Sequence, residues 1–440
     1  MTLNKKLIGL GMLLATTEVF AQTAGSASVE LYGIVDVGIV NVRNQLNADS
    51  AFPATVNVYS ATKSATVTNS VTAMANGGIQ DSRWGLRGTE DLGDGLKAFF
   101  TLESGFNAQN GQLNNCAQGL INGANTTLNN AANCSLNGQL FDRQAFVGLS
   151  DGNLGKVAFG YNYAPIVDIA AAYDPVQYSV LFSPIGFASS LGGGGGIAED
   201  TRVENSIRYT NKIGDVNFGG LYKLGGVAGS TSARSAYGIN VGYEAGNFGI
   251  QGVYQHFTDG YSGAQSATPG AVNVTVENSS AYFLAAKYVF GNATIKGGWE
   301  HYALQAASDY NTAATIGGGY YNYPLGTVTS YGWTGGVPNG APDKVVNVYF
   351  IGGDYNFTSA LNLAVGYYAI VNAAITANAL GAGATASSNI NALSALLDYH
   401  FSKRTDVYAG LMETSYGGLY NSPTYNSSNS ILGAGIRHKF

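Results

Sequence analysis

The chain of 440 residues is long enough for two or three soluble domains or one large one, and its composition narrows the choice. Charged residues make up 11%, whereas 29 Tyr and 19 Phe supply aromatic rings that suit a boundary between polar and apolar surroundings. A net charge of −6 argues against nucleic acid as a partner, because binding to phosphates needs a basic face.

The N-terminal segment predicts a secretory signal that is cleaved after Ala21. A basic pair, Lys5 and Lys6, precedes a short apolar run, and small residues stand just before the expected cleavage site. The alternative is an uncleaved anchor helix, but the apolar run is short for crossing a bilayer, and no later stretch reaches the roughly 18 apolar residues of a membrane helix. We therefore expect an exported chain, with residues 1–21 as the signal peptide and residues 22–440 as one domain.

Alternation of apolar and polar residues with a period of two begins at Val29 and recurs to the end of the chain. In the first such stretch Leu31 and Val35 lie on one face, and Glu30 and Asp36 lie on the other. This alternation indicates strands with one apolar and one polar face, and so an all-β fold. About sixteen strands are expected, near residues 29–43, 79–90, 96–107, 140–149, 154–163, 201–211, 216–225, 234–243, 248–257, 278–289, 293–305, 343–357, 360–371, 388–401, 405–415 and 429–440.

The connections between these strands alternate between short and long. Short ones such as 91–95 and 402–404 contain the residues of tight turns, and long ones include 44–78 and 164–200. An even number of antiparallel strands with all tight turns at one end predicts a transmembrane β-barrel, which must close because a bilayer cannot satisfy an open sheet edge. A secreted β-sandwich or β-helix fits less well, because a sandwich does not need this alternation and the chain shows no short internal repeat.

The final strand ends directly at an aromatic residue. Phe440, His438 and Ile436 lie on one side of it, and Lys439 and Arg437 lie on the other. In a closed barrel the last strand pairs with the first, so we expect the apolar side to face lipid and the terminal ring to lie at the membrane interface.

Cys116 and Cys134 are the only cysteines. In an exported protein such a pair is most simply a disulfide. A redox role is disfavoured because there is no CxxC motif, and a metal role because no histidine lies nearby. No cluster with metal-ligand spacing is present in the sequence, although acids in the loops could bind Ca²⁺ loosely. We expect no resident metal and no cofactor.

Three segments resemble the general porins of Gram-negative bacteria, and most of all the type typical of β-proteobacteria. They are Ser82–Phe106, Asp142–Tyr163 and the terminal aromatic strand. The resemblance covers essentially the whole mature chain. It implies a sixteen-stranded, trimeric outer-membrane barrel whose third long loop folds inward and narrows the pore. It also implies that Phe440 is read by the barrel-assembly machinery.

A barrel of this size leaves an aqueous lumen, and charged side chains at its constriction set ion selectivity. By resemblance, Arg83 and Arg143 match the arginines that form the basic half of the constriction in general porins, and Arg208 is a third candidate. Each could instead be a solvated lumen arginine without effect on flow. The inward faces carry three further candidate cations, Arg87, Lys97 and Arg202.

The third loop, residues 164–200, is too apolar for a freely solvated loop of its length. It carries Tyr173, Tyr178 and Phe182, so it must pack on a surface, and the inner wall of the barrel is available. The run Gly192–Gly196 favours a flexible segment over a phosphate-binding loop, because the Lys and Ser/Thr of such a loop do not follow it.

Acids of this loop are expected to form the second half of the constriction. Asp168 and Asp174 would face the arginines across the lumen. Glu199 and Asp200 are further candidates for the acidic side, although they are near enough to the next strand to pair with Arg202 instead.

The expected function is passive diffusion of ions and small hydrophilic solutes across the outer membrane of a Gram-negative bacterium, with a weak preference for anions. Expected partners are outer-membrane lipid and lipopolysaccharide, two further copies of the chain, and the barrel-assembly machinery. An enzyme built on the barrel would need a histidine near a nucleophile or an acid, and none of the four histidines stands in a recognisable constellation. An adhesin or receptor made from the long loops is the other alternative.

Overall fold

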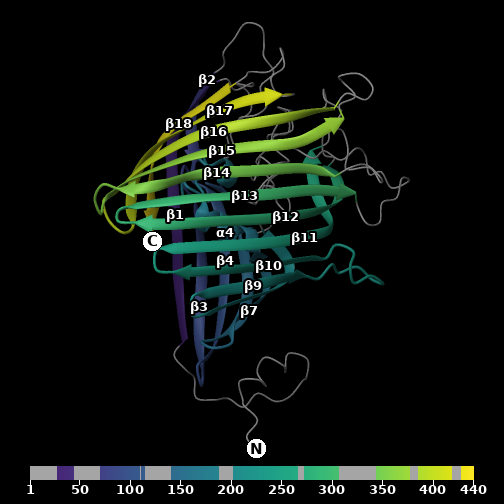
Figure 1. Ribbon diagram of the computed structural model, residues 1–440. Helices are drawn as coiled ribbons and strands as arrows, with labels where there is room; N and C mark the ends of the chain where they lie inside the picture. Colours follow the sequence, from purple (N-terminus) through teal and green to yellow (C-terminus); the bar gives the residue numbers. More distant parts are fainter. Residues whose placement is uncertain are drawn as a thin grey trace, which may run out of the picture.

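A single closed antiparallel sheet makes up most of the computed structural model (Figure 1). The structure describes residues 27–43, 70–109, 111–113, 140–187, 202–265, 272–306, 343–376, 385–418 and 428–440. The strands are β1 (Ala27–Arg43), β2 (Ser70–Asn76), β3 (Arg83–Gly93), β4 (Leu96–Asn107), β5 (Gln112–Leu113), β6 (Gln144–Asp151), β7 (Gly155–Tyr163), β8 (Arg202–Ile213), β9 (Val216–Lys223), β10 (Ala236–Ala245), β11 (Phe248–Gln265), β12 (Val272–Phe290), β13 (Ala293–Ala306), β14 (Lys344–Asn356), β15 (Leu361–Thr376), β16 (Thr385–His400), β17 (Thr405–Gly418) and β18 (Ser428–Lys439). The helices in this part of the chain, α4 (Pro165–Tyr173) and α5 (Pro184–Phe187), lie between β7 and β8 in the sequence.

The sheet closes because β1 has a partner on each edge. On one edge it pairs with β18, from Ile34 opposite Lys439 to Arg43 opposite Ser430. On the other edge it pairs with both β2 and β3, which together form the second barrel strand. The two-residue β5 is only a ribbon on β4. The described residues therefore contain sixteen antiparallel barrel strands, as the sequence pattern predicts. No helix among them is long and apolar enough to cross a bilayer.

Some predicted boundaries are wrong. Residues 44–78 were expected to be a loop, yet they contain β2, and the expected strand at 79–90 starts only at Arg83, because residues 77–82 leave the sheet. The expected strands at 248–257 and 278–289 are too short, since backbone pairing of β11 and β12 continues to Gln265 and Val272. Residues 258–265 show no strict alternation of apolar and polar residues, whereas residues 272–277 do alternate, a signal that the predicted strand did not include.

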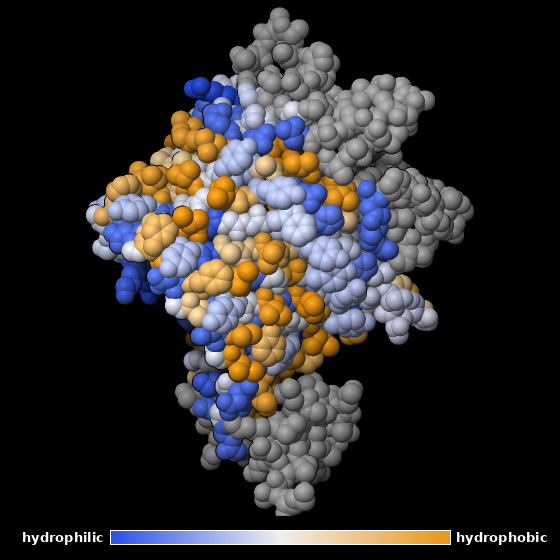
Figure 2. All heavy atoms as spheres, in the orientation of Figure 1, coloured by the Kyte–Doolittle hydropathy of each residue, from blue (hydrophilic) through white to orange (hydrophobic). Residues whose placement is uncertain are grey.

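The outward face of the barrel carries an apolar strip between two aromatic rows. Figure 2 shows hydrophobic side chains gathered over the strands that face the viewer in Figure 1. On several strands two exposed tyrosines stand six residues apart, with aliphatic residues between them, which corresponds to about 20 Å along a strand. Such rows flanking an apolar strip are the arrangement of a membrane-embedded barrel. These pairs are Tyr237 with Tyr243, Tyr282 with Tyr288, and Tyr349 with Tyr355.

The terminal strand has the predicted orientation. Leu432 and Ile436 are exposed on the outer face, whereas Arg437 is buried on the inner face. The backbone of Phe440 exchanges two hydrogen bonds with Gly33, at 3.1 and 3.0 Å, which extends the pairing of the last strand with the first. A Cβ at position 33 would overlap the Phe440 ring, so only glycine leaves room for that ring.

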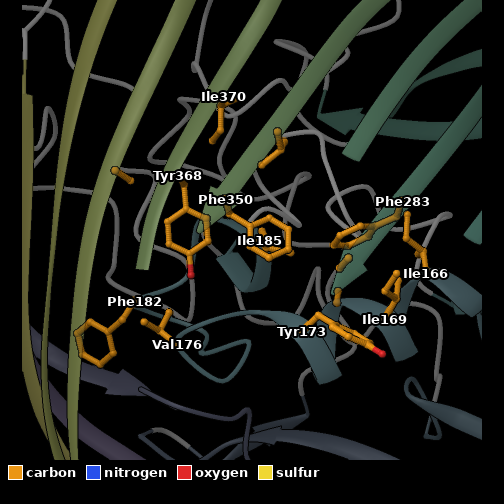
Figure 3. Close-up of a cluster of buried hydrophobic side chains, with 14 of the residues drawn as sticks. Ile166, Ile169, Tyr173, Val176, Phe182, Ile185, Phe283, Phe350, Tyr368 and Ile370 are labelled. Atoms are coloured by element: carbon orange, nitrogen blue, oxygen red, sulfur yellow. The ribbon is translucent and has the colours of Figure 1, made fainter. Parts of the chain in front are cut away.

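The described part of the third loop lies inside the barrel, as expected. Its helix α4 buries Ile166, Ile169, Ala170 and Tyr173, which are spaced to share one helix face. Figure 3 shows these side chains beside rings from the barrel wall, among them Phe283. Full burial of a side chain such as Ile contributes about 1.5–3 kcal/mol, which explains how a loop this apolar stays attached to the wall.

Candidate pore constriction

Four of the predicted arginines lie on one stretch of the inner wall: Arg83 on β3, Arg143 before β6, and Arg202 and Arg208 on β8. We call this stretch, which also includes β4 and β7, the basic wall. Arg83 is the first residue of β3, and Arg143 directly precedes β6. On the neighbouring strand β4, Glu103 is paired with Gln144. The register therefore puts a carboxylate next to both arginines.

Glu103 binds two arginines of the basic wall. Its Oε1 lies 2.8 Å from Nε of Arg143, and its Oε2 lies 3.6 Å from Nε of Arg83. Tyr32 donates its hydroxyl hydrogen to Oε2 at 2.9 Å. Both Arg143 and Glu103 are buried, so these contacts fix the direction of the guanidinium groups.

Tyr163 and Asp81 complete the surroundings of Arg143. Nη2 of Arg143 donates to the hydroxyl oxygen of Tyr163 at 2.8 Å, and Nη1 lies 3.3 Å from a carboxylate oxygen of Asp81. The guanidinium of Arg202 lies over the ring of Tyr163, 5.6 Å from its centroid. Tyr163 therefore holds two arginines apart while contacting both, one through its hydroxyl and one through its ring face.

An ion pair joins the third loop to the basic wall. Arg208 contacts the Asp168 carboxylate with Nη2 and donates from Nη1 to the backbone oxygen of Tyr163 at 2.9 Å. Asp168 lies on the exposed side of α4, where its side chain keeps 43% of its surface open. Of the predicted loop acids within the described residues, Asp168 is the one in contact with an arginine of the basic wall.

Asp174 was expected to face the arginines and instead lies on the opposite wall. It is fully buried and accepts a hydrogen bond from the Tyr368 hydroxyl at 2.6 Å and from the backbone N–H of Tyr178 at 2.6 Å. Lys296 donates to its backbone oxygen at 3.1 Å. Burial raises the pKa of Asp174, and these donors counteract the rise. Asp174 thus fastens the loop to β13 and β15, a position that its sequence neighbours did not indicate.

Two further predicted cations lie toward the end of the barrel where the short turns are. Arg87 forms an ion pair with the exposed Glu30 at 2.8 Å and stacks on Tyr32. Lys97 is exposed, and Asp91 is the residue opposite it in the strand register beside the β3–β4 turn. Four predicted residues lie outside the described part of the chain: Cys116, Cys134, Glu199 and Asp200.

Sequence reasoning missed two acids and one aromatic residue of this site. Glu103 was recognisable, because the period of two put it on the polar face of its strand, but nothing in the pattern paired it with Arg83 and Arg143. Asp81 gave no signal, since it lies in the segment that was expected to be regular strand. The position of Tyr163 at the end of β7 became meaningful only once the loop was seen to turn inward from it.

Two of the four histidines, His256 and His301, lie away from the basic wall. The Nδ1 atom of His256 is 2.9 Å from the Ser280 hydroxyl, and that of His301 is 3.0 Å from Asn347, all on the outward face of the barrel. They are separated from the basic wall by the sheet itself.

An acidic cluster lies beside the short β16–β17 turn. Ligand atoms of Asp398, His400 and Asp406 are within 4.8 Å of one another. Arg437 already occupies this cluster, because its Nη2 lies 2.9 Å from Asp406 and 3.5 Å from Asp398. Its guanidinium supplies the positive charge that two buried carboxylates need.

Comparison with known proteins agrees with this architecture. A family model described as Gram-negative porin matches residues 10–419. An outer membrane porin protein of Bordetella pertussis is 28% identical over 459 aligned residues, which cover 97% of this chain and 99% of the relative. Outer membrane porin protein 32 of Delftia acidovorans is 30% identical over 221 residues, which cover 50% of this chain and 48% of the relative.

Solved structures with the same fold include an anion-selective porin from Comamonas acidovorans, with a TM-score of 0.61 at 21% identity, covering 94% of this chain and 100% of that one. OmpT of Vibrio cholerae has a TM-score of 0.58 at 13% identity, covering 94% and 98%. The closed sixteen-stranded barrel, its apolar outer strip, its inward loop and the family match lead to one conclusion: the chain belongs to the Gram-negative porin family and is a passive channel of the outer membrane.

Proposed function

We propose that the protein forms a homotrimeric pore through which ions and small hydrophilic solutes diffuse down their gradients, with a weak preference for anions. The observation that carries the proposal is the contact between Arg208 on the basic wall and Asp168 on the inward loop. The arginines of the wall and the loop acid in contact with them put fixed charges at the neck of the lumen, and charges at the neck decide which ions pass.

The charge balance of the neck supports a weak preference. Four arginines, at positions 83, 143, 202 and 208, are in contact with Asp81, Glu103, Asp168 or the ring of Tyr163. The formal sum of the four arginines and these three acids is 4 − 3 = +1. Asp142 is a fourth acid nearby, whose pKa is raised by burial and lowered again by a hydrogen bond from the backbone N–H of Gly105 and by the charges of Arg202 and Arg143. An excess this small favours anions without excluding cations.

A trimer is part of the proposal. One solved relative with the same fold, OmpT of Vibrio cholerae, is described in a trimer form, with a TM-score of 0.58 at 14% identity. Closed cyclic symmetry is the usual form of such assemblies. No cofactor or energy source is required for diffusion through a lumen.

Single-channel recording in a planar bilayer with a salt gradient tests the proposal. Conductance that arrives in steps and closes in thirds is the result expected of an open trimeric pore, and the sign of the reversal potential decides between anions and cations. A folded barrel that inserts without conducting would overturn the proposal and favour an adhesin or receptor.

A further inference from the structure

The second barrel strand is interrupted by an inward segment, residues 77–82. On β1 the pairing with β3 ends at Ile34 and the pairing with β2 begins at Val37. Six residues of the second strand therefore stand opposite only two residues of the first. The surplus chain turns into the barrel, where Gly78 and Ile79 are buried. An interruption of this size is larger than the single extra residue of an ordinary β-bulge.

Asp36, one of the two residues opposite the interruption, binds the inward segment. Its carboxylate accepts hydrogen bonds from three consecutive backbone N–H groups, those of Gly78 at 3.1 Å, Ile79 at 3.1 Å and Gln80 at 2.8 Å. Tyr408 on β17 donates its hydroxyl hydrogen to the same carboxylate at 2.6 Å. Asp36 is fully buried, so these are charge-assisted bonds in surroundings without competing solvent.

The other side of the inward segment binds the third loop. The carbonyl oxygens of Gly78 and Ile79 accept from the N–H groups of Leu181 and Val180, at 3.1 and 3.2 Å. The N–H and C=O groups of a peptide point in opposite directions, so the segment is held between Asp36 on the wall and the loop in the lumen. The carboxylate and the loop thus contact opposite edges of the same short stretch of backbone.

Phe182 fixes the loop a second time, on the neighbouring wall. Its ring packs against that of Tyr408, with centroids 6.5 Å apart. The ring also covers Gly410 and Gly433, where an added Cβ would come within 2.8 and 3.2 Å of it. Only glycine at these positions gives the ring a flat surface to lie on.

We propose that Asp36 is a positioning residue of the pore: through the inward segment and Tyr408 it holds the far part of the third loop against the wall and so keeps the lumen open beside the basic wall. The inference rests on the proposed function, because it assigns the width of the pore to this attachment. At its near end the loop is joined to the basic wall by Asp168 and Arg208. If residues 180–182 lose these contacts, the part of the loop beyond Asp174, which is itself bound to Tyr368, gains the freedom to move into the lumen.

Amide exchange and single-channel recording on matched variants of the full chain test this inference. Asp36→Asn keeps the shape of the side chain but removes its charge. Gly410→Ala disturbs the packing of the Phe182 ring on Gly410 without changing any charge. Tyr408→Phe removes one hydroxyl and keeps the ring. Glu30→Gln is the control, since it neutralises another carboxylate of β1, whose ion-pair partner within the described part of the chain is Arg87.

In the three test variants we expect exchange of the Val180 and Leu181 amides to accelerate about tenfold, while exchange in the strands stays as in the parent. In Asp36→Asn and Tyr408→Phe the reason is the weakening or loss of charge-assisted bonds, which costs free energy on this scale. In Gly410→Ala the reason is that the added methyl group displaces the Phe182 ring. In the same variants we expect more frequent partial closures, with an unchanged reversal potential for Gly410→Ala. Glu30→Gln should behave as the parent in exchange.

Unchanged exchange and unchanged closures in both Asp36→Asn and Gly410→Ala would overturn the inference. Faster exchange and more closures in Asp36→Asn without any change in Gly410→Ala would also overturn it, because that result would point to the charge of Asp36 and not to the position of the loop. If the parent itself never conducts, the proposed pore function fails, yet the exchange experiment still reports whether Asp36 holds the loop. The two failures are therefore distinguishable.

Discussion

Glu103 joins two arginines of the basic wall and is itself almost completely buried. Its charge offsets part of the positive charge of Arg83 and Arg143, which in the proposed function acts on passing ions. A residue that fixes the direction of two guanidinium groups and also cancels part of their charge affects geometry and selectivity together.

We expect Glu103→Gln to raise the anion preference, because the amide keeps the size of the side chain but no longer offsets the arginines. We expect the ratio of anion to cation permeability to rise about twofold. This change corresponds to about 0.5 kcal/mol, the interaction energy of an ion with one partly screened charge. The reversal potential in a salt gradient measures it. Arg143→Ala should shift the potential the opposite way, and Glu413→Gln, on the outward face, should leave it unchanged. Equal potentials in the parent and Glu103→Gln would refute this reading.

The buried carboxyl of Asp174 makes the attachment of the third loop depend on pH. Burial raises its pKa above the ordinary value of 3.8, so the folded protein binds this proton more tightly than the unfolded chain does. The sign follows from linkage: the attachment is least favourable when Asp174 is ionised, and it gains stability as the pH falls through the raised pKa. Amide exchange of residues 165–178, corrected for its intrinsic pH dependence, should slow on acidification from pH 7. Asp174→Asn should remove that trend, and faster exchange in acid would contradict the prediction.

Among the elements, strands inside the membrane were predictable and those outside it were not. Lipid demands apolar side chains on every second residue, which is why the alternation located β10 and β18 from sequence. Beyond the apolar strip lipid no longer imposes this alternation, although the backbones of the extended parts of β11 and β12 remain paired. The break before β3 was hidden, because the sequence does not reveal that Asp36 binds N–H groups from it.

The helix α4 was a missed signal of a different kind. Its buried residues, Ile166, Ile169, Ala170 and Tyr173, follow the i, i+3, i+4, i+7 spacing of an amphipathic helix, and Pro165 stands at its first turn. The segment was interpreted only as an apolar loop. The same spacing puts Asp168 on the face of α4 opposite its buried residues. From that face Asp168 reaches Arg208 of the basic wall, whereas Asp174 does not.

Ile169→Ala should release α4 without unfolding the barrel. Ile169 is completely buried against the inner wall, and truncating such a side chain costs about 2–5 kcal/mol in a well-packed core. We expect faster amide exchange in residues 165–173, whereas the temperature at which the barrel loses its heat-modifiable mobility on gels stays unchanged. Ala172→Ser, on the exposed side of the same helix, is the control. A matching fall in barrel stability would show that helix and strands unfold as one unit.

For the whole molecule, the seam between the first and last strands is the place where closure is decided. Gly33 and Phe440 exchange backbone hydrogen bonds there, and the ring of Phe440 occupies the space that a side chain at position 33 would need. The recognition of Phe440 by the assembly machinery stays a prediction, but its place in the seam gives it a structural task as well.

Gly33→Ala should weaken this seam. The added methyl group overlaps the terminal ring, and overpacking of this kind costs about 1–3 kcal/mol. A lower midpoint temperature for the loss of heat-modifiable mobility measures the effect. Gly252→Ala is the matched control, because a Cβ there meets its nearest atom only at 3.8 Å. Identical midpoints for the two variants would mean that the ring moves aside freely.

The contact between Asp36 and Tyr408 also imposes an order of events on biogenesis. The two residues are 372 positions apart, on the first strand and on the last but one, so their hydrogen bond forms only when nearly the whole chain is in place. The Phe182 ring also packs against Gly433 of the final strand, so this packing forms equally late. A barrel that has not yet received its last two strands therefore lacks both contacts, and residues 180–182 reach their final attachment only at the end of barrel assembly.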